Sequence, residues 1–227
     1  VETGSGMWDV KKTLTGHSDK VMCVAALADG RFATGSDDTV VCVAVLNDGR
    51  TGPRLVTGSY DMSPVKVWEE SSPGSGDWSV QATLAGHRKI VTCVAVLADG
   101  RFVTGSADTT VKVWKESSPG SSAWSVEATL AGHSSAVNCV AVLADGRFAT
   151  GGEGGQVYVW HESSPGVWDV EATLTGHSSN VRCMAVIPQI TGCVDGRFVT
   201  GSDDNTVKVW KESSPGNGEW GVEATLT

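Results

Sequence analysis

The chain contains 227 residues, of which 28 are glycine, and its formal net charge is −9 at neutral pH. An acidic chain does not fit the nucleic-acid-binding class, whose domains typically present a basic face. The longest apolar run, Val40–Leu46, is far shorter than the ~20 residues of a membrane-spanning helix. Neither a nucleic acid nor a membrane is therefore expected as a partner.

The sequence consists of repeated units. The dipeptide Gly-His occurs four times, with its histidines at positions 17, 87, 133 and 177. The segments Thr83–Trp114 and Thr129–Trp160 are near copies that begin 46 residues apart, and such internal similarity predicts a repeat fold. In chain order the units span approximately residues 8–38, 40–69, 78–115, 124–160 and 168–211, and an outer strand at 220–226 follows them.

The first two units are partial. The 70 residues that separate His17 from His87 contain two Cys-Val-Ala segments but only one Val-Lys-Val-Trp segment. We therefore expect that the first unit has lost its back half and the second its front half, with the join near Thr39–Val41. Whether Thr39–Pro64 folds as one blade stays open at this point.

Each complete unit contains four short runs that are rich in valine, threonine and tryptophan. In the third unit these runs are Ser79–Leu84, Val91–Leu97, Arg101–Gly105 and Thr110–Trp114, and turn signals separate them. Short runs of this kind predict β-strands. Four strands in about 45 residues indicate a blade of a β-propeller. We predict one all-β domain over 1–227, a β-propeller of four-stranded antiparallel blades with about 4–5 blade units, either a fragment of a larger ring or a small ring.

The ordered set of motifs resembles the tryptophan–aspartate (WD) repeat β-propeller family. The set runs Gly-His, an apolar strand, Asp-Gly, Thr-Gly-Ser-x-Asp and Val-Lys-Val-Trp, and it covers essentially the whole chain. The chain departs from the family pattern in one respect, because the residue after the strand tryptophan is never aspartate.

The resemblance implies a hydrogen-bonded tetrad of His, Ser or Thr, Asp and Trp within a blade. Matched by motif, two complete tetrads are His87, Thr104, Asp108 and Trp114, and His177, Thr200, Asp204 and Trp210. A third set, His133, Thr150 and Trp160, is incomplete because Gly154 stands where the aspartate belongs. A buried indole N–H needs an acceptor and a buried imidazole needs partners on both nitrogens, so these residues are expected to be structural.

The resemblance also implies that the protein binds a protein or peptide on the face carrying the Gly-His loops. The positions carried over to this face give the following candidate contacts: Lys20, Tyr60, Arg88, Lys89, Ile90, Asn138, Asn180, Arg182 and Asp203. Tyr60, Arg182 and the run Arg88–Ile90 are the expected anchors, because tyrosine and arginine are enriched in interface hot spots. A basic patch on an acidic protein favours an acidic or phosphorylated partner.

The sequence also bears on metal sites, cellular location, self-association and alternative functions. No Cys-x-x-Cys pair is present, so no metal site and no cofactor are expected, and five cysteines share one strand position as reduced core thiols. Reduced thiols favour a cytoplasmic location, with the nucleus as the second option. Open blade edges at the two ends predict self-association. The main alternatives to a non-enzymatic scaffold are a relic or designed repeat array without a selected partner and, third, a propeller enzyme.

Overall fold

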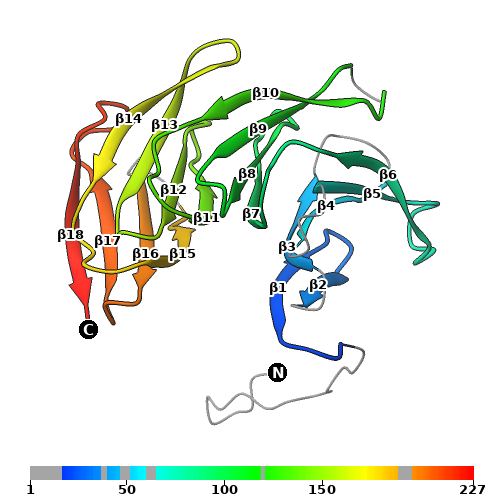
Figure 1. Cartoon of the computed structure of the whole chain (residues 1–227), viewed down its shortest axis with the longest axis horizontal. Helices are drawn as coiled ribbons and strands as arrows, with labels where there is room; N and C mark the ends of the chain where they lie inside the picture. Colours follow the sequence, from blue (N-terminus) through cyan, green and yellow to red (C-terminus); the bar gives the residue numbers. More distant parts are fainter. Residues whose placement is uncertain (1–16, 37–39, 47–51, 60–64, 119–120, 189–195) are drawn as a thin grey trace.

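The computed structural model describes residues 17–36, 40–46, 52–59, 65–118, 121–188 and 196–227. Within these residues the regular elements are all β-strands, arranged in five antiparallel sheets (Figure 1). Blade 1 is a hairpin of two strands, and blades 2 to 5 each have four strands in the order in which they follow along the chain. The all-β propeller-blade prediction is confirmed.

The strand bounds follow the repeats closely. Blade 1 contains β1 (Val21–Ala26) and β2 (Phe32–Ser36), and blade 2 contains β3 (Val40–Leu46), β4 (Arg54–Ser59), β5 (Val65–Glu70) and β6 (Trp78–Leu84). Blade 3 contains β7 (Val91–Val96), β8 (Phe102–Ser106), β9 (Val111–Glu116) and β10 (Trp124–Leu130). Blade 4 contains β11 (Val137–Val142), β12 (Phe148–Gly152), β13 (Val157–Ser164) and β14 (Val167–Leu174), and blade 5 contains β15 (Val181–Val186), β16 (Arg197–Ser202), β17 (Val207–Glu212) and β18 (Trp220–Leu226).

The Asp-Gly turns set the spacing between the first two strands of a blade. Gly100 adopts a φ of +87°, and its N–H donates to the carbonyl of Leu97. A positive φ is readily accessible only to glycine, which explains why the turn uses this residue. The carboxylate of Asp99 accepts a hydrogen bond from the Arg101 N–H, so the turn delivers Arg101 to the start of β8 in a fixed position.

The hydrophobic core lies between neighbouring blades rather than inside any one of them. The side of blade 3 that faces blade 4 presents Val111 and Val113, which pack against Phe148 and Trp160 of blade 4. The same arrangement recurs between blades 2 and 3 and between blades 4 and 5. A blade therefore buries its apolar residues only when the next blade is in place, as expected for a repeat architecture.

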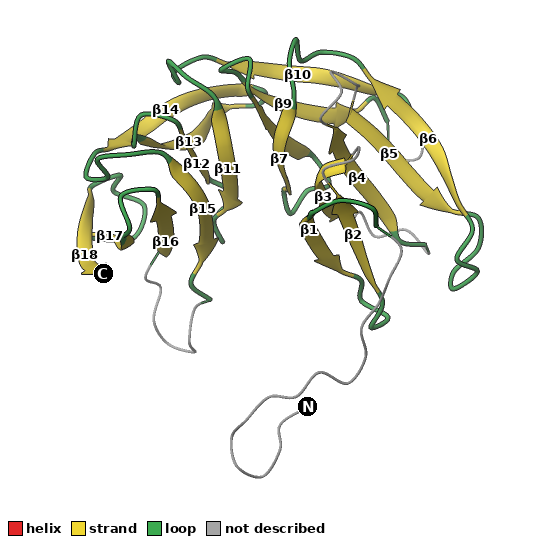
Figure 2. Cartoon of the chain, turned by 60° about the horizontal axis from the view of Figure 1, so that its bottom comes forward, coloured by secondary structure: helices red, strands yellow, loops and turns green. Residues whose placement is uncertain are grey.

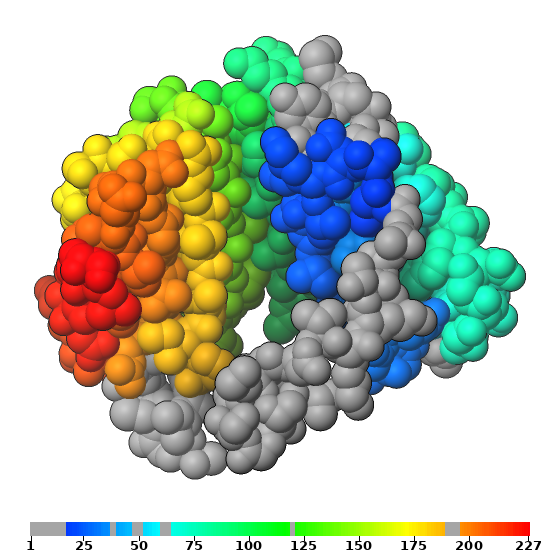
Figure 3. Space-filling model, turned by 90° about the horizontal axis from the view of Figure 1, so that it is seen from below, coloured from blue at the N-terminus to red at the C-terminus, as the bar shows by residue number. Residues whose placement is uncertain are grey.

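The five sheets form an open arc. Blade 1 and blade 5 lie at its two ends, with their inner strands β1 and β15 on the concave side (Figures 1 and 2). Figure 3 shows the two end sheets on opposite sides of a central opening. The outward face of blade 5 is uncovered: Leu226 is 55% exposed, whereas its counterpart Leu174 in blade 4 is 5% exposed.

The partial sequence units correspond to one half blade and one complete blade. Blade 2 has all four strands, because β6, which belongs to the third unit in sequence, closes it. The second unit lacks the Gly-His loop and the outer strand that would complete blade 1. Residues 47–51 and 60–64, within the segment Thr39–Pro64, lie outside the described residues, and so does the outer strand expected near Trp8.

Hydrogen exchange is expected to be fastest in blade 1. Its Phe32 is 53% exposed, whereas Phe102 at the same position of blade 3 is completely buried. Sparse apolar contact lowers the free energy of local opening. Exchange measured by NMR or mass spectrometry should therefore be faster in β1–β2 than in β7–β8. Equal protection of the two hairpins would contradict this arrangement.

Candidate functional site: the Gly-His face

The first and third loops of each blade lie at one end of the sheets, which we call the Gly-His face. Its loops come from the segments before β7, β11 and β15 and from the turns between the second and third strands. Main-chain hydrogen bonds join the two kinds of loop: Ala107 N–H donates to Ile90, Glu153 to Ala136, and Asp203 to Asn180. The repeated bond fixes each turn against its neighbouring loop and makes the face a continuous surface.

The structure joins the residues of the two complete tetrads in chains of hydrogen bonds. In blade 3, Trp114 Nε1 donates to Thr104 Oγ1 at 2.8 Å, and His87 Nε2 lies 2.8 Å from the same hydroxyl. His87 Nδ1 lies 3.0 Å from Asp108. Blade 5 repeats the chain with His177, Thr200, Asp204 and Trp210. Every buried nitrogen of these rings has a partner, which leaves none of them free to act as a ligand or base.

The tetrad of blade 3 also organises its loops. The Asp108 carboxylate accepts hydrogen bonds from the Thr110 hydroxyl and N–H and from the Arg88 N–H. Burial alone would raise the pKa of Asp108, but these hydrogen bonds and the nearby His87 hold that pKa well below its ordinary value. Desolvation lowers the pKa of His87. The ionised Asp108 therefore fixes the backbone at Arg88 on the Gly-His face.

Blade 4 replaces the missing aspartate with an aromatic contact. His133 Nε2 lies 2.8 Å from Thr150 Oγ1, which also accepts from Trp160 Nε1. The other edge of the imidazole meets the Tyr158 ring, with the ring centroids 4.6 Å apart. Because no carboxylate compensates for desolvation, burial lowers the pKa of His133 to about 4.

The His133 pKa gives a measurable pH dependence. A histidine whose folded pKa lies below its ordinary value of 6.5 contributes its full stability above pH 6.5. That contribution is lost as the pH falls from 6.5 towards 4, up to about 3 kcal/mol, because the unfolded state binds the proton more readily. NMR titration of the His133 ring should show a midpoint near 4, and a midpoint near 6.5 would contradict the buried position.

Among the described residues, blades 1 and 2 each show two members of a tetrad, and Asp38 and Asp61 lie outside those residues. In blade 1, His17 Nε2 lies 2.8 Å from Thr34 Oγ1, and the described sheet has no third strand to supply the tryptophan. In blade 2, Trp68 Nε1 donates to Thr57 Oγ1 at 2.9 Å. These two partial tetrads reflect the break in the repeat pattern near residue 40.

Arginines connect neighbouring blades at the end opposite the Gly-His face. Arg147, at the turn before β12, forms two hydrogen bonds of 2.7 and 2.8 Å with Glu212 at the end of β17 in blade 5. It also contacts Glu171 and Asp145, and its guanidinium lies over the Trp220 ring at 5.5 Å. We call this arrangement the interblade clasp; it recurs as Arg31–Glu70, Arg54–Glu116 and Arg101–Glu162.

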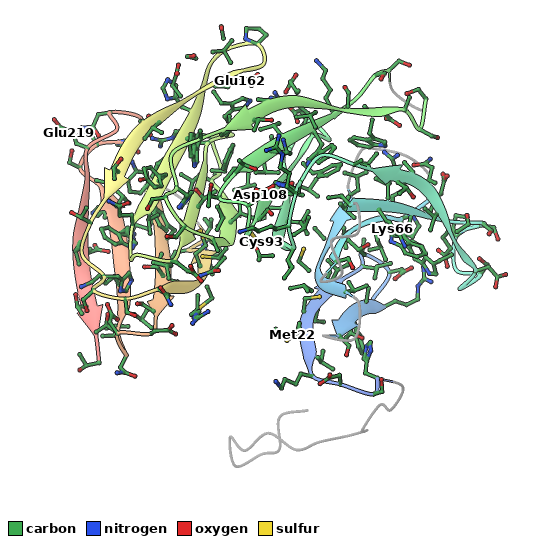
Figure 4. All side chains as sticks on the ribbon, in the orientation of Figure 1. Met22, Lys66, Cys93, Asp108, Glu162 and Glu219 are labelled. Atoms are coloured by element: carbon green, nitrogen blue, oxygen red, sulfur yellow. The ribbon has the colours of Figure 1, made fainter. Side chains whose placement is uncertain are left out.

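Sequence reasoning missed the interblade clasp, although the signal was present. An arginine follows Asp-Gly at positions 31, 50, 101, 147 and 197, and a glutamate stands two residues after the third-strand tryptophan in every blade that has one. Figure 4 places Glu162 on the outer side of the arc, away from Cys93 on the inner side. The interblade clasp therefore lies at the outer rim of the arc and not at its central opening.

The candidate partner residues of blade 3 are exposed together. Arg88 and Lys89 are exposed and Ile90 is half-buried; we call these three residues the blade 3 patch. Within the described residues, neither the Arg88 nor the Lys89 side chain has a recorded hydrogen bond or ion pair. Only the main chain of the segment is engaged, through the Arg88 N–H and the carbonyls of Lys89 and Ile90.

The candidate residues of blades 4 and 5 have partners within the protein. Arg182 pairs with Asp203 at 2.5 Å, and Asn180 donates to the same carboxylate. The hydrogen bonds between these two side chains lower the pKa of Asp203 and raise the pKa of Arg182. Asn138 Nδ2 donates to the carbonyl of Val181 in the next blade, so it contributes to contact between the inner strands. Arg182 is thus a neutralised cation rather than a free basic anchor.

The remaining candidates are Lys20 and Tyr60, of which Lys20 is among the described residues. Lys20 is exposed on the loop before β1, where its N–H donates to the carboxylate of Asp19. Tyr60 lies outside the described residues, so its predicted role as an anchor has no structural counterpart here. Lys20 directly precedes β1 of blade 1, and blade 2 lies between blade 1 and blade 3 along the arc (Figure 1).

The described cysteines line the inner strands as free thiols. Burial raises the pKa of Cys93 to about 12 and the pKa values of Cys42 and Cys139 well above the ordinary range. Cys183 is exposed because no sheet covers the outward face of blade 5, and Cys193 lies outside the described residues. Among the described side chains no group of three or more His, Cys, Asp or Glu is placed to hold a metal ion. The same residues include no helix that could cross a membrane.

Sheets of four antiparallel strands, packed face to face and fixed by His–Thr–Trp hydrogen bonds, define the class of β-propeller blades. The family model described as WD domain, G-beta repeat, matches residues 8–44, 78–115, 124–161 and 168–211, which is more than half of the chain. The chain belongs to the WD-repeat family. No curated protein matches it. Repeats of this family generally act as scaffolds for protein–protein interaction.

Proposed function

We propose that this chain is a non-enzymatic scaffold that binds a protein or peptide on the Gly-His face, with the blade 3 patch as its anchor. The observation that carries the proposal is the pair of exposed cations, Arg88 and Lys89, which have no recorded side-chain partner in the described structure. Their backbone is held by Asp108, which accepts from the Arg88 N–H, and by Ser106, whose hydroxyl donates to the Lys89 carbonyl. A preorganised loop loses little entropy when it binds.

The charge pattern favours an acidic or phosphorylated segment as the partner. The chain carries a net charge of −9, and Arg88 and Lys89 are two adjacent exposed cations without a recorded side-chain partner in the described structure. Arginine forms strong charge-assisted hydrogen bonds with carboxylate and phosphate groups. Ile90, half-buried beside the cations, adds an apolar contact for a neighbouring side chain of the partner. Arg182 and Lys20 would extend the same surface. For Arg182 this requires that the ligand compete with Asp203, its partner in an ion pair.

Capture from a degenerate phosphoserine peptide library, beside its unphosphorylated counterpart, tests the proposal. The wild-type chain should retain phosphorylated and Glu-rich peptides. The variant Arg88→Glu/Lys89→Glu should retain at least tenfold less, because each ligand anion would then meet like charges. The variant Lys115→Glu/Lys211→Glu makes the same change in net charge at the opposite rim and serves as the matched control.

Two results would count against the binding face. The first is equal retention of both library forms by the wild-type chain. The second is equal loss of binding in the two charge-reversal variants, which would indicate a general effect of net charge. Thermal melts of both variants show whether a loss of binding reflects a loss of folding.

Self-association through the open ends is a second part of the proposal. The outward face of blade 5 exposes Val207 and Leu226, and blade 1 exposes Val21 and Phe32 at the other end. Uncovered sheet faces and strand edges favour pairing with a second copy. Light scattering should show a mass that rises with protein concentration, and a strict monomer at the highest concentration would refute this part.

We also propose a cytoplasmic location, with the nucleus as the alternative. The five described cysteines are free, and three of them are buried between blades with raised pKa values. Such thiols suit a reducing compartment. Fluorescence imaging of the tagged chain in cells tests this proposal, and accumulation in the secretory pathway would contradict it.

A further inference from the structure

The outer edge of β2 has no strand beside it in the described structure. In every other sheet the second strand pairs on both sides; β8, for example, pairs with β7 and β9. Within the described residues β2 pairs with β1 alone. Only residues 37–39 connect Ser36 to Val40, so the chain enters blade 2 without forming a third strand. The unpaired main-chain groups of such an edge are a template for another strand.

Two residues of β2 lack the contacts that a third strand gives their counterparts. Phe102, Phe148 and Phe198 are fully buried and stack on a third-strand tryptophan. Phe32 occupies the same position and is 53% exposed, because in the described structure neither a third strand nor a preceding blade covers it. The hydroxyl of Thr34 contacts His17 in the described structure, whereas Thr104 also accepts a hydrogen bond from Trp114. Within the described residues, no indole ring occupies the place in blade 1 that corresponds to Trp114 in blade 3.

Beside the outer edge of β2 lies a groove that has room for the side chains on the other face of a third strand. A cavity of about 120 Å³ lies between Ala33 and Thr34 of blade 1 and Leu55, Trp68 and Trp78 of blade 2. Between blades 3 and 4 the corresponding space is filled by Val111 and Val113, which are completely buried against Phe148 and Trp160. The groove is therefore shaped for two small apolar side chains that alternate along an extended strand.

We propose that the groove binds an extended segment of another polypeptide as the third strand of blade 1. The segment has the pattern Val-x-Val-Trp and runs antiparallel to β2. The register of β8 with β9 places the tryptophan opposite Phe32 and the two valines opposite Ala33 and Gly35. Strand addition of this kind gains affinity from main-chain hydrogen bonds and specificity from alternate side chains.

The pairing in the other blades argues against a second copy as the donor. The four segments of this chain with a Val-x-Val-Trp pattern form β5, β9, β13 and β17, and each already pairs on both sides in its own blade. A second copy would have to open a complete blade to donate one. The site lies on an edge and groove away from the blade 3 patch, so this inference does not rest on the binding proposed for that patch, although it shares Phe32 with the proposed self-association surface.

A fluorescent peptide with the sequence of residues 109–116, Thr-Thr-Val-Lys-Val-Trp-Lys-Glu, tests the proposal by anisotropy. We expect saturable binding, with at least tenfold weaker affinity when the peptide tryptophan becomes alanine or when both valines become lysine. The protein variant Phe32→Ala should weaken binding by a similar factor. The variant Thr34→Val should weaken the tryptophan peptide about fivefold, the loss of one hydrogen bond, and leave a Trp→Phe peptide unaffected.

The matched control is Leu226→Ala, which truncates an exposed apolar residue on blade 5. Peptide binding should be unchanged in this variant. The proposal is overturned if the peptide fails to bind, if Phe32→Ala and Thr34→Val bind normally, or if Leu226→Ala loses binding equally. It is also overturned if Phe32→Ala dissociates an oligomer while the peptide does not bind, because a second copy would then occupy the groove. Phe32 and Thr34 are exposed, and circular dichroism of both variants checks that the fold is retained.

Discussion

Replacement of Trp114 by alanine is expected to lower the free energy of unfolding by about 3–5 kcal/mol, the range found for large buried aromatic residues. Trp114 is 1% exposed and packs in the core between blades 2 and 3 with Val56 and Val67. Its indole N–H is also the donor to Thr104, so the variant removes a hydrogen bond from a buried network. Urea unfolding followed by fluorescence or circular dichroism measures the loss.

Trp124→Ala is the matched control for this prediction. Trp124 lies on the outer strand β10, is half-buried, and its buried Nε1 has no hydrogen-bond partner in the described structure. Its removal should therefore cost less than the removal of Trp114. Equal losses for the two variants would contradict the proposed positions of the inner and outer tryptophans.

Replacement of Arg147 by methionine should destabilise the protein by about 3–5 kcal/mol, because it leaves a buried charge without its partner. Burial opposes ionisation of Glu212, but hydrogen bonds from Arg147 and from the N–H groups of Gly216 and Gly218 lower its pKa to about 2. Glu212 is only 3% exposed. Without Arg147 its carboxylate would remain buried with two main-chain donors alone.

The pH dependence separates this effect from a simple loss of packing. A carboxylate with a lowered pKa contributes stability above its ordinary value of 4.5 and loses it as the pH falls towards 2. The difference in the free energy of unfolding between wild type and Arg147→Met should therefore be largest above pH 4.5 and shrink below it. Arg197→Met is the control, since the side chains of Arg197 and its partner Glu223 are 34% and 35% exposed and the loss of this pair should matter less. A difference in the free energy of unfolding that is constant with pH would contradict the role assigned to the interblade clasp.

The repeated motifs of the sequence are sufficient to predict the strands and the tetrads. Gly-His, Thr-Gly-Ser and Val-Lys-Val-Trp recur in the same order, so the motif match already assigns His87 to Thr104 and Trp114. These contacts lie within one blade and 10 to 17 residues apart in sequence. Contacts of this kind follow from the repeat itself.

Contacts between blades could not be predicted in the same way. Arg147 and Glu212 are 65 residues apart, and their meeting depends on how two complete sheets pack. The pairing of Arg182 with Asp203 lies within blade 5, but it depends on how the side chain at the start of β15 meets the turn between β16 and β17. The half blade was obscured for another reason: a sequence unit starts with the outer strand of the previous blade, so its boundaries differ from those of the sheets.

The role of the Gly-His face is tested most directly by hydrogen exchange of the protein bound to a captured phosphoserine peptide. We predict slower exchange in the loop around Arg88 and in the turn at Ala107–Thr110, which a main-chain hydrogen bond joins to that loop. Exchange at Asp99–Arg101, at the opposite end of the same sheet, should be unchanged. Protection at Asp99–Arg101 without protection around Arg88 would contradict the assignment of the Gly-His face as the partner surface.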